Sequence, residues 1–190
     1  MKNKTELKEK LSDVANKISN ILLETSAKDN LKKSDIDEVI TTILKTLGEV
    51  SRADRCYIWE NYVEDDDSIS DMHYMRQIYE WAEGVDAVQG TELIEFVPYD
   101  PITFDILSSK QNVNSIVKDL DEYNRSILEP QGIKSILVAP IHLSNNHFWG
   151  FIGFDNCHTE EIWEDFEEEI LSQIGTNIGE FICKFKHLFH

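Results

Sequence analysis

Apolar residues recur with helical spacing near the start of the chain. Over residues 3–26 they alternate in steps of four and three with charged residues between, which is the a/d pattern of a helix that packs along a partner. The pattern leaves two partners open, its own domain or a second copy of the chain across a dimer. The apolar positions are Leu7, Leu11, Val14, Ile18 and Ile21.

A second helical stripe follows a polar break at residues 29–33. Ser34 is the expected N-cap and Gly48 the expected end of this helix, since both residue types are common at those positions. We therefore divide the chain into an amphipathic helix at 1–30, the candidate dimerisation segment, and one domain at 31–190. The stripe consists of Ile36, Val39, Ile40, Ile43, Leu44 and Leu47.

The middle of the chain predicts strands interrupted by short helices. Strands are expected at about 55–62, 73–83 and 113–117, and short helices at 102–109 and 119–129. The aspartate run that begins at Asp65 predicts an exposed loop after the first strand, and a long connection is expected from Gly90 to Tyr99.

The segment from Pro130 to Asp155 predicts an antiparallel hairpin. Two runs rich in apolar, aromatic and β-branched residues, 135–143 and 147–154, are joined by Ser144, Asn145 and Asn146, which supply turn chemistry. Gly150 and Gly153 lie inside the second run. Glycine within a strand indicates a bulge or a close approach by another group.

A long final helix is expected from Asp165, which forms a capping box with Glu168. Its apolar stripe reaches the chain end without a cap, so the helix is expected to continue in the natural protein; a complete small protein is the alternative. Together with the first seam, this stripe predicts a homodimer through the terminal helices, parallel or antiparallel. The stripe consists of Ile170, Leu171, Ile174, Ile178, Phe181, Ile182 and Phe185.

These segments in order resemble a GAF domain, of the type found in bacterial and archaeal sensor histidine kinases and cyclic-dinucleotide signalling proteins. The resemblance rests on "RADRCYIWE", "YEWAEGV", "VNSIVKDLD", "QGIKSILVAPI", "FWGFIGFDN" and "EEIWEDFEEEIL", and covers roughly residues 35 to 185. It implies an α/β (α+β) GAF/PAS-like sandwich. A central antiparallel sheet of about five or six strands would carry the N- and C-terminal helices on one face and short helices and loops on the other.

The resemblance also implies a non-catalytic sensory domain, the input module of a signal-transduction protein. Its ligand would lie between one face of the sheet and the connections after the second and third strands. Ordinary core packing is the alternative for each aromatic candidate, and no metal, cofactor or catalytic residue is expected. By position, the candidates for ligand binding are Trp81, Phe96, Tyr99, Phe104, Ile116 and Asp155.

Three related functions compete with this interpretation. Phytochrome-like GAF domains attach a bilin through a Cys-His pair, but Tyr123 and Asn124 stand at those positions here. Free methionine sulfoxide reductases resemble a bare GAF domain with paired pocket cysteines, whereas Cys56, Cys157 and Cys183 are widely spaced and match none of those positions. A purely structural dimerisation module, whose pocket is filled by its own side chains, is the third.

The net charge of the chain limits the kinds of partner that it can bind. The chain has 36 acidic and 18 basic residues and a formal net charge of -18, which repels nucleic acid and anionic membranes alike. No apolar run reaches the ~20 residues that span a bilayer. The three cysteines are odd in number and widely spaced, which indicates reduced thiols, so we expect a cytoplasmic location. Only Arg76, Arg125 and Lys134 are basic near the expected pocket, which favours a neutral or cationic ligand.

Overall fold

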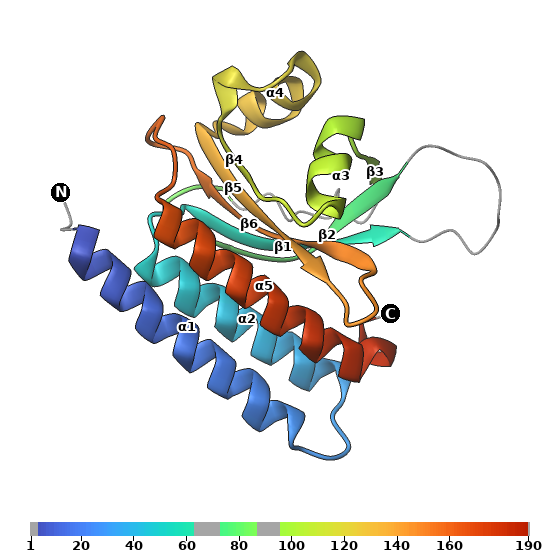
Figure 1. Cartoon of the computed structure of the whole chain (residues 1–190). Helices are drawn as coiled ribbons and strands as arrows, with labels where there is room; N and C mark the ends of the chain where they lie inside the picture. The colour runs from blue at the N-terminus through green and yellow to red at the C-terminus, as the bar shows by residue number, and fades with distance from the viewer. Residues whose placement is uncertain (1–3, 63–72, 87–95, 190) are drawn as a thin grey trace.

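A six-stranded antiparallel sheet forms the middle layer of the molecule (Figure 1). The computed structural model describes residues 4–62, 73–86 and 96–189. The strand order is β3-β2-β1-β6-β5-β4, so β1 and β6 lie at the centre. The strands are β1 (Arg55–Tyr62), β2 (Tyr74–Ala82), β3 (Val97–Pro98), β4 (Val113–Ile116), β5 (Ser135–His142) and β6 (Phe148–Asn156).

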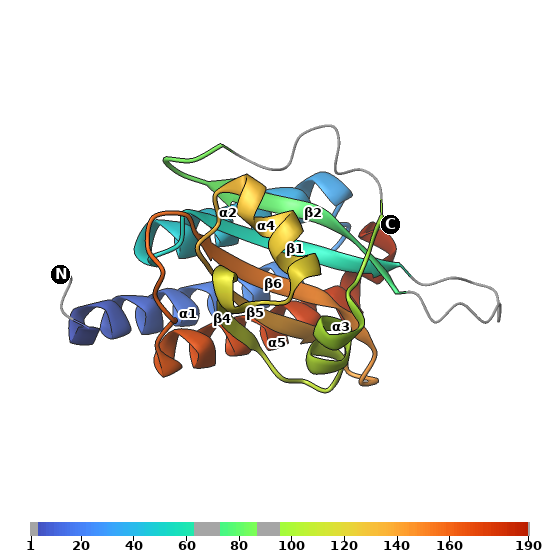
Figure 2. The same cartoon turned by 90° about the horizontal axis from the view of Figure 1, so that it is seen from above.

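The helices divide between the two faces of this sheet (Figures 1 and 2). The long helices α1 (Lys4–Ser26), α2 (Lys33–Val50) and α5 (Asp165–Phe185) form a layer on one face. The short helices α3 (Pro101–Ser108) and α4 (Glu122–Leu128) cross the other face. This arrangement confirms the predicted sandwich. Short 3₁₀ turns cover Val117–Asp119, Glu129–Gln131 and Lys186–Leu188.

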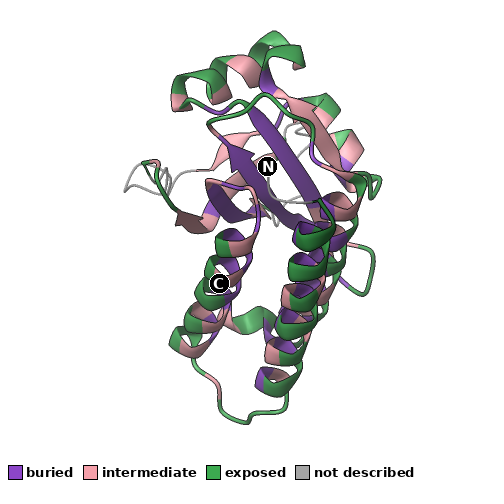
Figure 3. Ribbon diagram, turned by 90° about the vertical axis from the view of Figure 1, so that its left-hand side faces the viewer, coloured by how far each residue is buried: buried purple, intermediate pink, exposed green. Residues whose placement is uncertain are grey.

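The main core lies between the long helices and the sheet, where the inward sides of the elements are buried (Figure 3). Helix α1 contributes to this core by packing against α2 and α5. Its seam is therefore covered by helices of the same chain, and the homodimer stays a prediction. The buried hydrophobic residues of α1 are Leu7, Leu11, Ala15, Ile18 and Leu22. Val14 and Ile21 of the predicted seam are only half-buried, and the neighbouring Ala15 and Leu22 are buried in their place.

Helix α5 lies unusually close to β5 because two glycines face the strand. A Cβ atom at Gly179 would come within 2.3 Å of the carbonyl oxygen of His142. At Gly175 the nearest atom would be the carbonyl oxygen of Pro140, at 3.2 Å. Any side chain at Gly179 would therefore push the helix away from the sheet.

Helix α2 begins and ends outside its predicted bounds. Its N-cap is Lys32 and not Ser34, because the backbone N–H of Lys32 donates to the Asp35 carboxylate at 2.7 Å. The helix continues past Gly48, whose missing side chain leaves room for the ring of Trp81; a Cβ there would lie 2.1 Å from it. Gly48 is thus a packing residue within the helix.

The start of α5 differs from the prediction by one residue. The reciprocal capping pair is Glu164 with Glu167, and not Asp165 with Glu168. The backbone N–H of Glu164 donates to the Glu167 carboxylate at 2.9 Å. Glu167 takes this capping role because its side chain points inward, where it also accepts hydrogen bonds from Arg52.

The hairpin of β5 and β6 confirms its prediction. Asn146 takes a positive φ of 64°, and the N–H of Leu143 donates to the carbonyl of His147 at 2.9 Å. A Cβ at Gly150 would lie 2.1 Å from the carbonyl oxygen of Trp59, so this glycine marks a close backbone approach.

Two details of the sequence prediction concern the segments that flank β2 and β3. The loop predicted at Asp65 lies outside the described residues. The short strand β3 falls within the segment expected to be an irregular connection. None of the helices in the described part of the chain is long and apolar enough to cross a membrane.

Candidate functional site

A cavity of about 390 Å³ lies between the sheet and the layer of α3 and α4. Its volume falls within the range of sites for small organic ligands. Strands β1, β2, β5 and β6 form its floor, and the segment 97–107 together with 123–133 forms its roof. The fold thus leaves a hollow on the face of the sheet that the long helices do not cover.

Strand β1 supplies the floor through its alternating pattern. Tyr57 and Trp59 point into the cavity, whereas Cys56 and Ile58 belong to the core beneath the long helices. Since successive side chains of a strand face opposite sides, one strand serves both layers. Trp59 stacks against Phe151 of β6, with ring centroids 5.9 Å apart.

Strand β2 contributes two polar side chains because it contains a bulge. Tyr57 pairs with Glu80 and Trp59 with Gln77, which leaves Ile78 as an extra residue between them. The extra residue reverses the alternation. Gln77 and Glu80 therefore both line the cavity, although they are three residues apart.

Gly153 of β6 allows Tyr57 to reach Asp155. A Cβ at Gly153 would lie 2.3 Å from the Tyr57 ring, so the ring lies across the glycine. The Tyr57 hydroxyl donates to Asp155 Oδ1 at 2.8 Å. Burial raises the pKa of Asp155 to about 7; the hydrogen bond from Tyr57 and the charge of Arg55 oppose this rise, and the charge of Glu80 adds to it.

Arg55 lies behind this end of the cavity between two carboxylates. Its Nη1 is 3.7 Å from Asp155 Oδ2, and its Nε is 3.9 Å from Glu80 Oε1. The Arg55 Nε–H also donates to the carbonyl of Asp86 at 3.1 Å. The three side chains are 4%, 6% and 2% exposed respectively, so water screens their charges little. The Arg55 guanidinium thus lies close to two buried carboxyl groups.

The roof is held together by Asp100, the N-cap of α3. Its carboxylate accepts from the backbone N–H of Thr103 at 2.9 Å and from Asn124 Nδ2 of α4 at 3.0 Å. Burial pushes the pKa of Asp100 upward, but hydrogen bonds from Thr103 and Asn124 outweigh burial and leave the pKa below its ordinary value. Tyr99 adds a tie to the sheet, because its hydroxyl donates to Asn61 Oδ1 at 2.6 Å.

The cavity wall is largely apolar, and its charged residues are acidic. Three carboxylates line it, and none of the described lining residues is lysine, arginine or histidine. Arg76, which the sequence placed near the pocket, pairs with Glu60 at 2.5 Å on strands β2 and β1. Neither Arg125 nor Lys134 lines the cavity. The lining carboxylates are Glu80, Asp100 and Asp155, and the lining aromatic residues are Tyr57, Trp59, Tyr99, Tyr123 and Phe151.

The structure brings two of the six predicted binding residues, Tyr99 and Asp155, to the cavity wall. Phe104 packs edge-on against Tyr99, with ring centroids 5.4 Å apart, and is not part of the wall. Ile116 lies at the end of β4, paired with Ser135. A role in ligand binding stays a prediction for each.

The remaining two candidates lie elsewhere. Phe96 packs beside Tyr62, with ring centroids 4.7 Å apart, and the Arg76 guanidinium carbon lies 4.9 Å from the centre of the Phe96 ring. Trp81 belongs to the core on the opposite face, against Gly48, because the bulge reverses the alternation of β2. A tryptophan four residues from Gln77 would otherwise share its face.

Sequence reasoning missed the polar part of the floor, formed by Tyr57, Gln77 and Glu80. A signal for Tyr57 was present, since Tyr57 and Trp59 alternate with two smaller apolar residues in β1. For Gln77 and Glu80 no signal was available, because the bulge that brings them together leaves no mark in the sequence.

The residues considered for pigment or thiol chemistry have other partners. Tyr123 donates to the carbonyl of Pro98 at 3.1 Å, and Asn124 binds the two aspartates that cap α3 and α4. None of the three cysteines lines the cavity. Burial raises the pKa of both Cys56 and Cys157, which disfavours the thiolate that redox chemistry needs.

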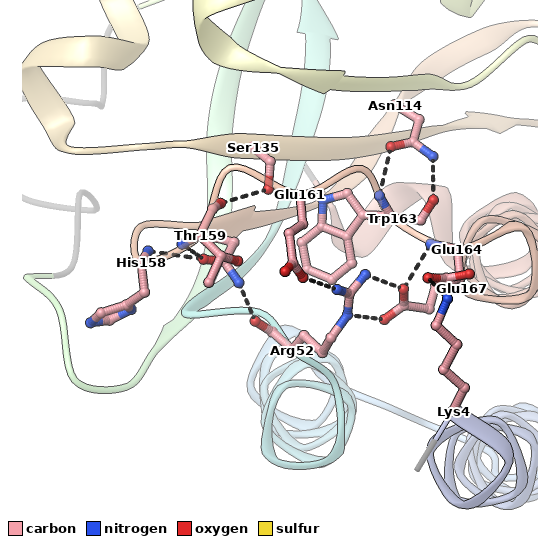
Figure 4. Close-up of polar contacts among 11 residues, drawn as sticks. Lys4, Arg52, Asn114, Ser135, His158, Thr159, Glu161, Trp163, Glu164 and Glu167 are labelled. Atoms are coloured by element: carbon pink, nitrogen blue, oxygen red, sulfur yellow. Dashed lines mark hydrogen bonds and ion pairs between the residues drawn. The ribbon is translucent and has the colours of Figure 1, made fainter. Parts of the chain in front are cut away.

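A second polar cluster joins the end of β6 to the start of α5 (Figure 4). Arg52 donates to both oxygens of Glu167, from Nε at 3.0 Å and from Nη2 at 2.6 Å. Its carbonyl accepts from Asn156 Nδ2 at 2.9 Å, and its guanidinium lies 5.1 Å from the centre of the Trp163 ring. Asn156 directly follows Asp155, so this cluster connects the cavity floor with α5.

Comparison with known proteins supports this architecture. The family model of the GAF domain matches residues 35–182. The methanogenesis regulatory histidine kinase FilI of Methanothrix harundinacea (strain 6Ac) is 40% identical in an alignment of 149 residues that covers 76% of this chain. The chain spans only 16% of that kinase.

Solved GAF domains have the same fold. The phycocyanobilin-bound GAF domain of a cyanobacterial phytochrome superposes with a TM-score of 0.67 at 17% identity, over 92% of this chain and 96% of that one. The phycoerythrobilin-bound GAF domain of a cyanobacterial phytochrome gives a TM-score of 0.67 at 16% identity, over 92% and 97%. At this identity the likeness concerns the fold alone.

Proposed function

The chain belongs to the GAF domain family, and from that premise we propose that it is the sensory input domain of a longer signal-transduction protein. In this proposal a small organic molecule binds in the cavity between the sheet and α3 and α4, and the domain itself catalyses no reaction. The observation that carries the proposal is the cavity of about 390 Å³, with its apolar walls and its polar end at Asp155.

The similarity to a regulatory histidine kinase supports a place in a two-component system. We further propose that the domain acts in the cytoplasm as a dimer, with α5 as the element that carries the signal onward. The cluster of Arg52 and Glu167 supports α5 in this role, because it ties the strand that ends in the cavity to the first turn of that helix.

The sulfoxide reductase and the bilin-binding domain have less support as alternatives. A sulfoxide reductase needs a nucleophilic thiol close to a resolving thiol, and the raised pKa values of Cys56 and Cys157 disfavour that chemistry. Covalent bilin attachment needs a cysteine at the cavity, where Tyr123 stands instead. A purely structural module is the alternative from another class, and a cavity of about 390 Å³ that the described side chains do not fill argues against it.

The test is a metabolite screen by thermal shift, followed by titration with tryptophan fluorescence, since Trp59 lines the cavity. A ligand that binds only the folded state at a hundredfold excess over its dissociation constant stabilises the protein by roughly 2.7 kcal/mol. Each hit should be lost in Val138→Phe, which fills the cavity from β5.

Ile162→Phe is the matched control, because residue 162 is 50% exposed and lies outside the cavity. Hits that survive Val138→Phe bind elsewhere. If no metabolite class stabilises the wild type, the sensory proposal fails and the structural module is favoured. Thiol-dependent reduction of free methionine sulfoxide that disappears in Cys157→Ser would instead support the enzyme.

A further inference from the structure

The charges and unpaired polar groups of the cavity narrow the class of ligand, provided that the cavity binds a small molecule as proposed above. We propose that the ligand is an organic cation that also carries an oxygen able to accept a hydrogen bond. Its positive group would lie at the end of the cavity formed by Tyr57, Glu80 and Asp155, and its oxygen near Gln77.

The charge balance at that end calls for a cation. Glu80 and Asp155 line the cavity, and among the ion pairs of the described residues Arg55 behind them supplies one positive charge for the two carboxylates. With both carboxylates ionised, this buried group carries one excess negative charge. An excess charge away from water is unfavourable until a proton or another cation joins it.

The aromatic walls suit the same ligand. Tyr57, Trp59, Tyr99 and Phe151 surround the space above the carboxylates, and Trp59 and Phe151 are stacked beside each other. Aromatic faces attract ammonium groups, most strongly where water is excluded. An anion would meet three carboxylates there and none of the described lysine, arginine or histidine side chains.

Gln77 is an independent indication of a ligand. It is 7% exposed and lines the cavity, and its Nε2 has no hydrogen-bond partner among the described residues. An unpaired buried amide is costly, so a ligand oxygen at this point would remove a penalty that the free protein bears. Through the register of β1, Gln77 lies about 7 Å along the sheet from Glu80, which separates the two ends of the ligand.

The experiment uses three probes that share one ring and differ in charge. Tyramine, tyrosol and 4-hydroxyphenylacetate carry a phenol group and a short chain that ends in an ammonium, a hydroxyl or a carboxylate. Titration calorimetry at about pH 8 keeps the alkyl ammonium protonated. We expect tyramine to bind roughly tenfold more tightly than tyrosol, and 4-hydroxyphenylacetate to bind most weakly.

Variants then locate the charge preference. Asp155→Asn should abolish the advantage of tyramine over tyrosol while keeping an acceptor for the Tyr57 hydroxyl. Glu80→Gln provides a second variant should the first fold poorly. Glu60→Gln is the matched control, because this buried carboxylate pairs with Arg76 and lies outside the cavity; it should leave the preference unchanged.

A fourth probe, 2-phenylethylamine, lacks the phenol oxygen. The wild type should bind 2-phenylethylamine more weakly than tyramine. Gln77→Leu should bind the two amines equally well. If tyrosol or 4-hydroxyphenylacetate binds as tightly as tyramine or more tightly, the inference that the ligand is a cation is wrong. The sensory proposal then stays intact, because the cavity still binds a ligand. If none of the four probes binds, the inference also falls, and the metabolite screen alone decides the sensory proposal.

Discussion

The pKa of Asp155 makes the stability of the protein depend on pH in a defined direction. In the folded chain this pKa is about 7, against an ordinary value of 3.8, because the carboxyl group is buried beside Glu80. Between these two values the folded state holds a proton that the unfolded state has released. The free energy of unfolding therefore falls as pH rises through this window.

The magnitude follows from the two pKa values. A shift of one pKa unit corresponds to about 1.36 kcal/mol. The loss in the free energy of unfolding therefore grows from near zero below about pH 4 to about 4 kcal/mol above about pH 8. Roughly 2 kcal/mol of this cost develops between about pH 5 and 7. Asp155→Asn removes the titration and keeps an acceptor for the hydroxyl of Tyr57, whose own pKa burial raises far above this window.

The assay is urea unfolding of wild type and Asp155→Asn at several pH values from about 5 to 8. Other titrating groups occur in both proteins, so they cancel in the difference between them. The variant should gain about 2 kcal/mol relative to wild type between about pH 5 and 7. Glu60→Gln, which removes another buried carboxylate of the same sheet, is the control for the loss of a buried carboxylate as such. A difference that stays constant with pH would mean that Asp155 is ionised throughout, and the account of the buried charges would be wrong.

Three other predictions concern packing, the cluster at α5 and assembly. Gly179→Ala should lower the free energy of unfolding by about 2 kcal/mol in chemical denaturation, because its Cβ would collide with the His142 carbonyl; Gly175→Ala, with more room, should change it little. Glu167→Gln should cost about 3 kcal/mol by breaking the buried pair with Arg52, and Glu161→Gln, which alters an exposed partner of the same arginine, under about 1 kcal/mol. Sedimentation equilibrium at tens of micromolar should show a dimer, and a clean monomer would reject that prediction.

Most of the fold was predictable because its signals are local. The hairpin of β5 and β6 needs two apolar runs and a turn with Asn146 at positive φ, all of which stand in consecutive residues. The layers follow from the helical stripes of α2 and α5 and the strands between them. The caps of both helices were misplaced by one or two residues. At α5 the capping carboxylate is that of Glu167, whose buried position only the packed structure decides, whereas at α2 it is that of the surface residue Asp35, which competes with Ser34 for the same role.

The cavity was less predictable because its wall is assembled from segments far apart in the sequence. Tyr99 and Asp155 were found by position, but Trp81 was assigned to the wrong face. One extra residue in β2, Ile78, determines that face, and its effect depends on pairing with β1. The partner of α1 was open for a similar reason, since an a/d seam looks the same whether it meets helices of its own chain or of another.

The alternation of side chains along β6 connects the cavity floor with the core beneath the long helices. In β6, Phe151 and Asp155 line the cavity, whereas Ile152 and Phe154 between them belong to the core beneath the long helices. Ile152 lies against α5, where a Cβ at Gly175 would be 3.5 Å from its Cγ2. A displacement of β6 toward the long helices would therefore move the Ile152 side chain against α5 at Gly175, where close packing leaves little free space to absorb it.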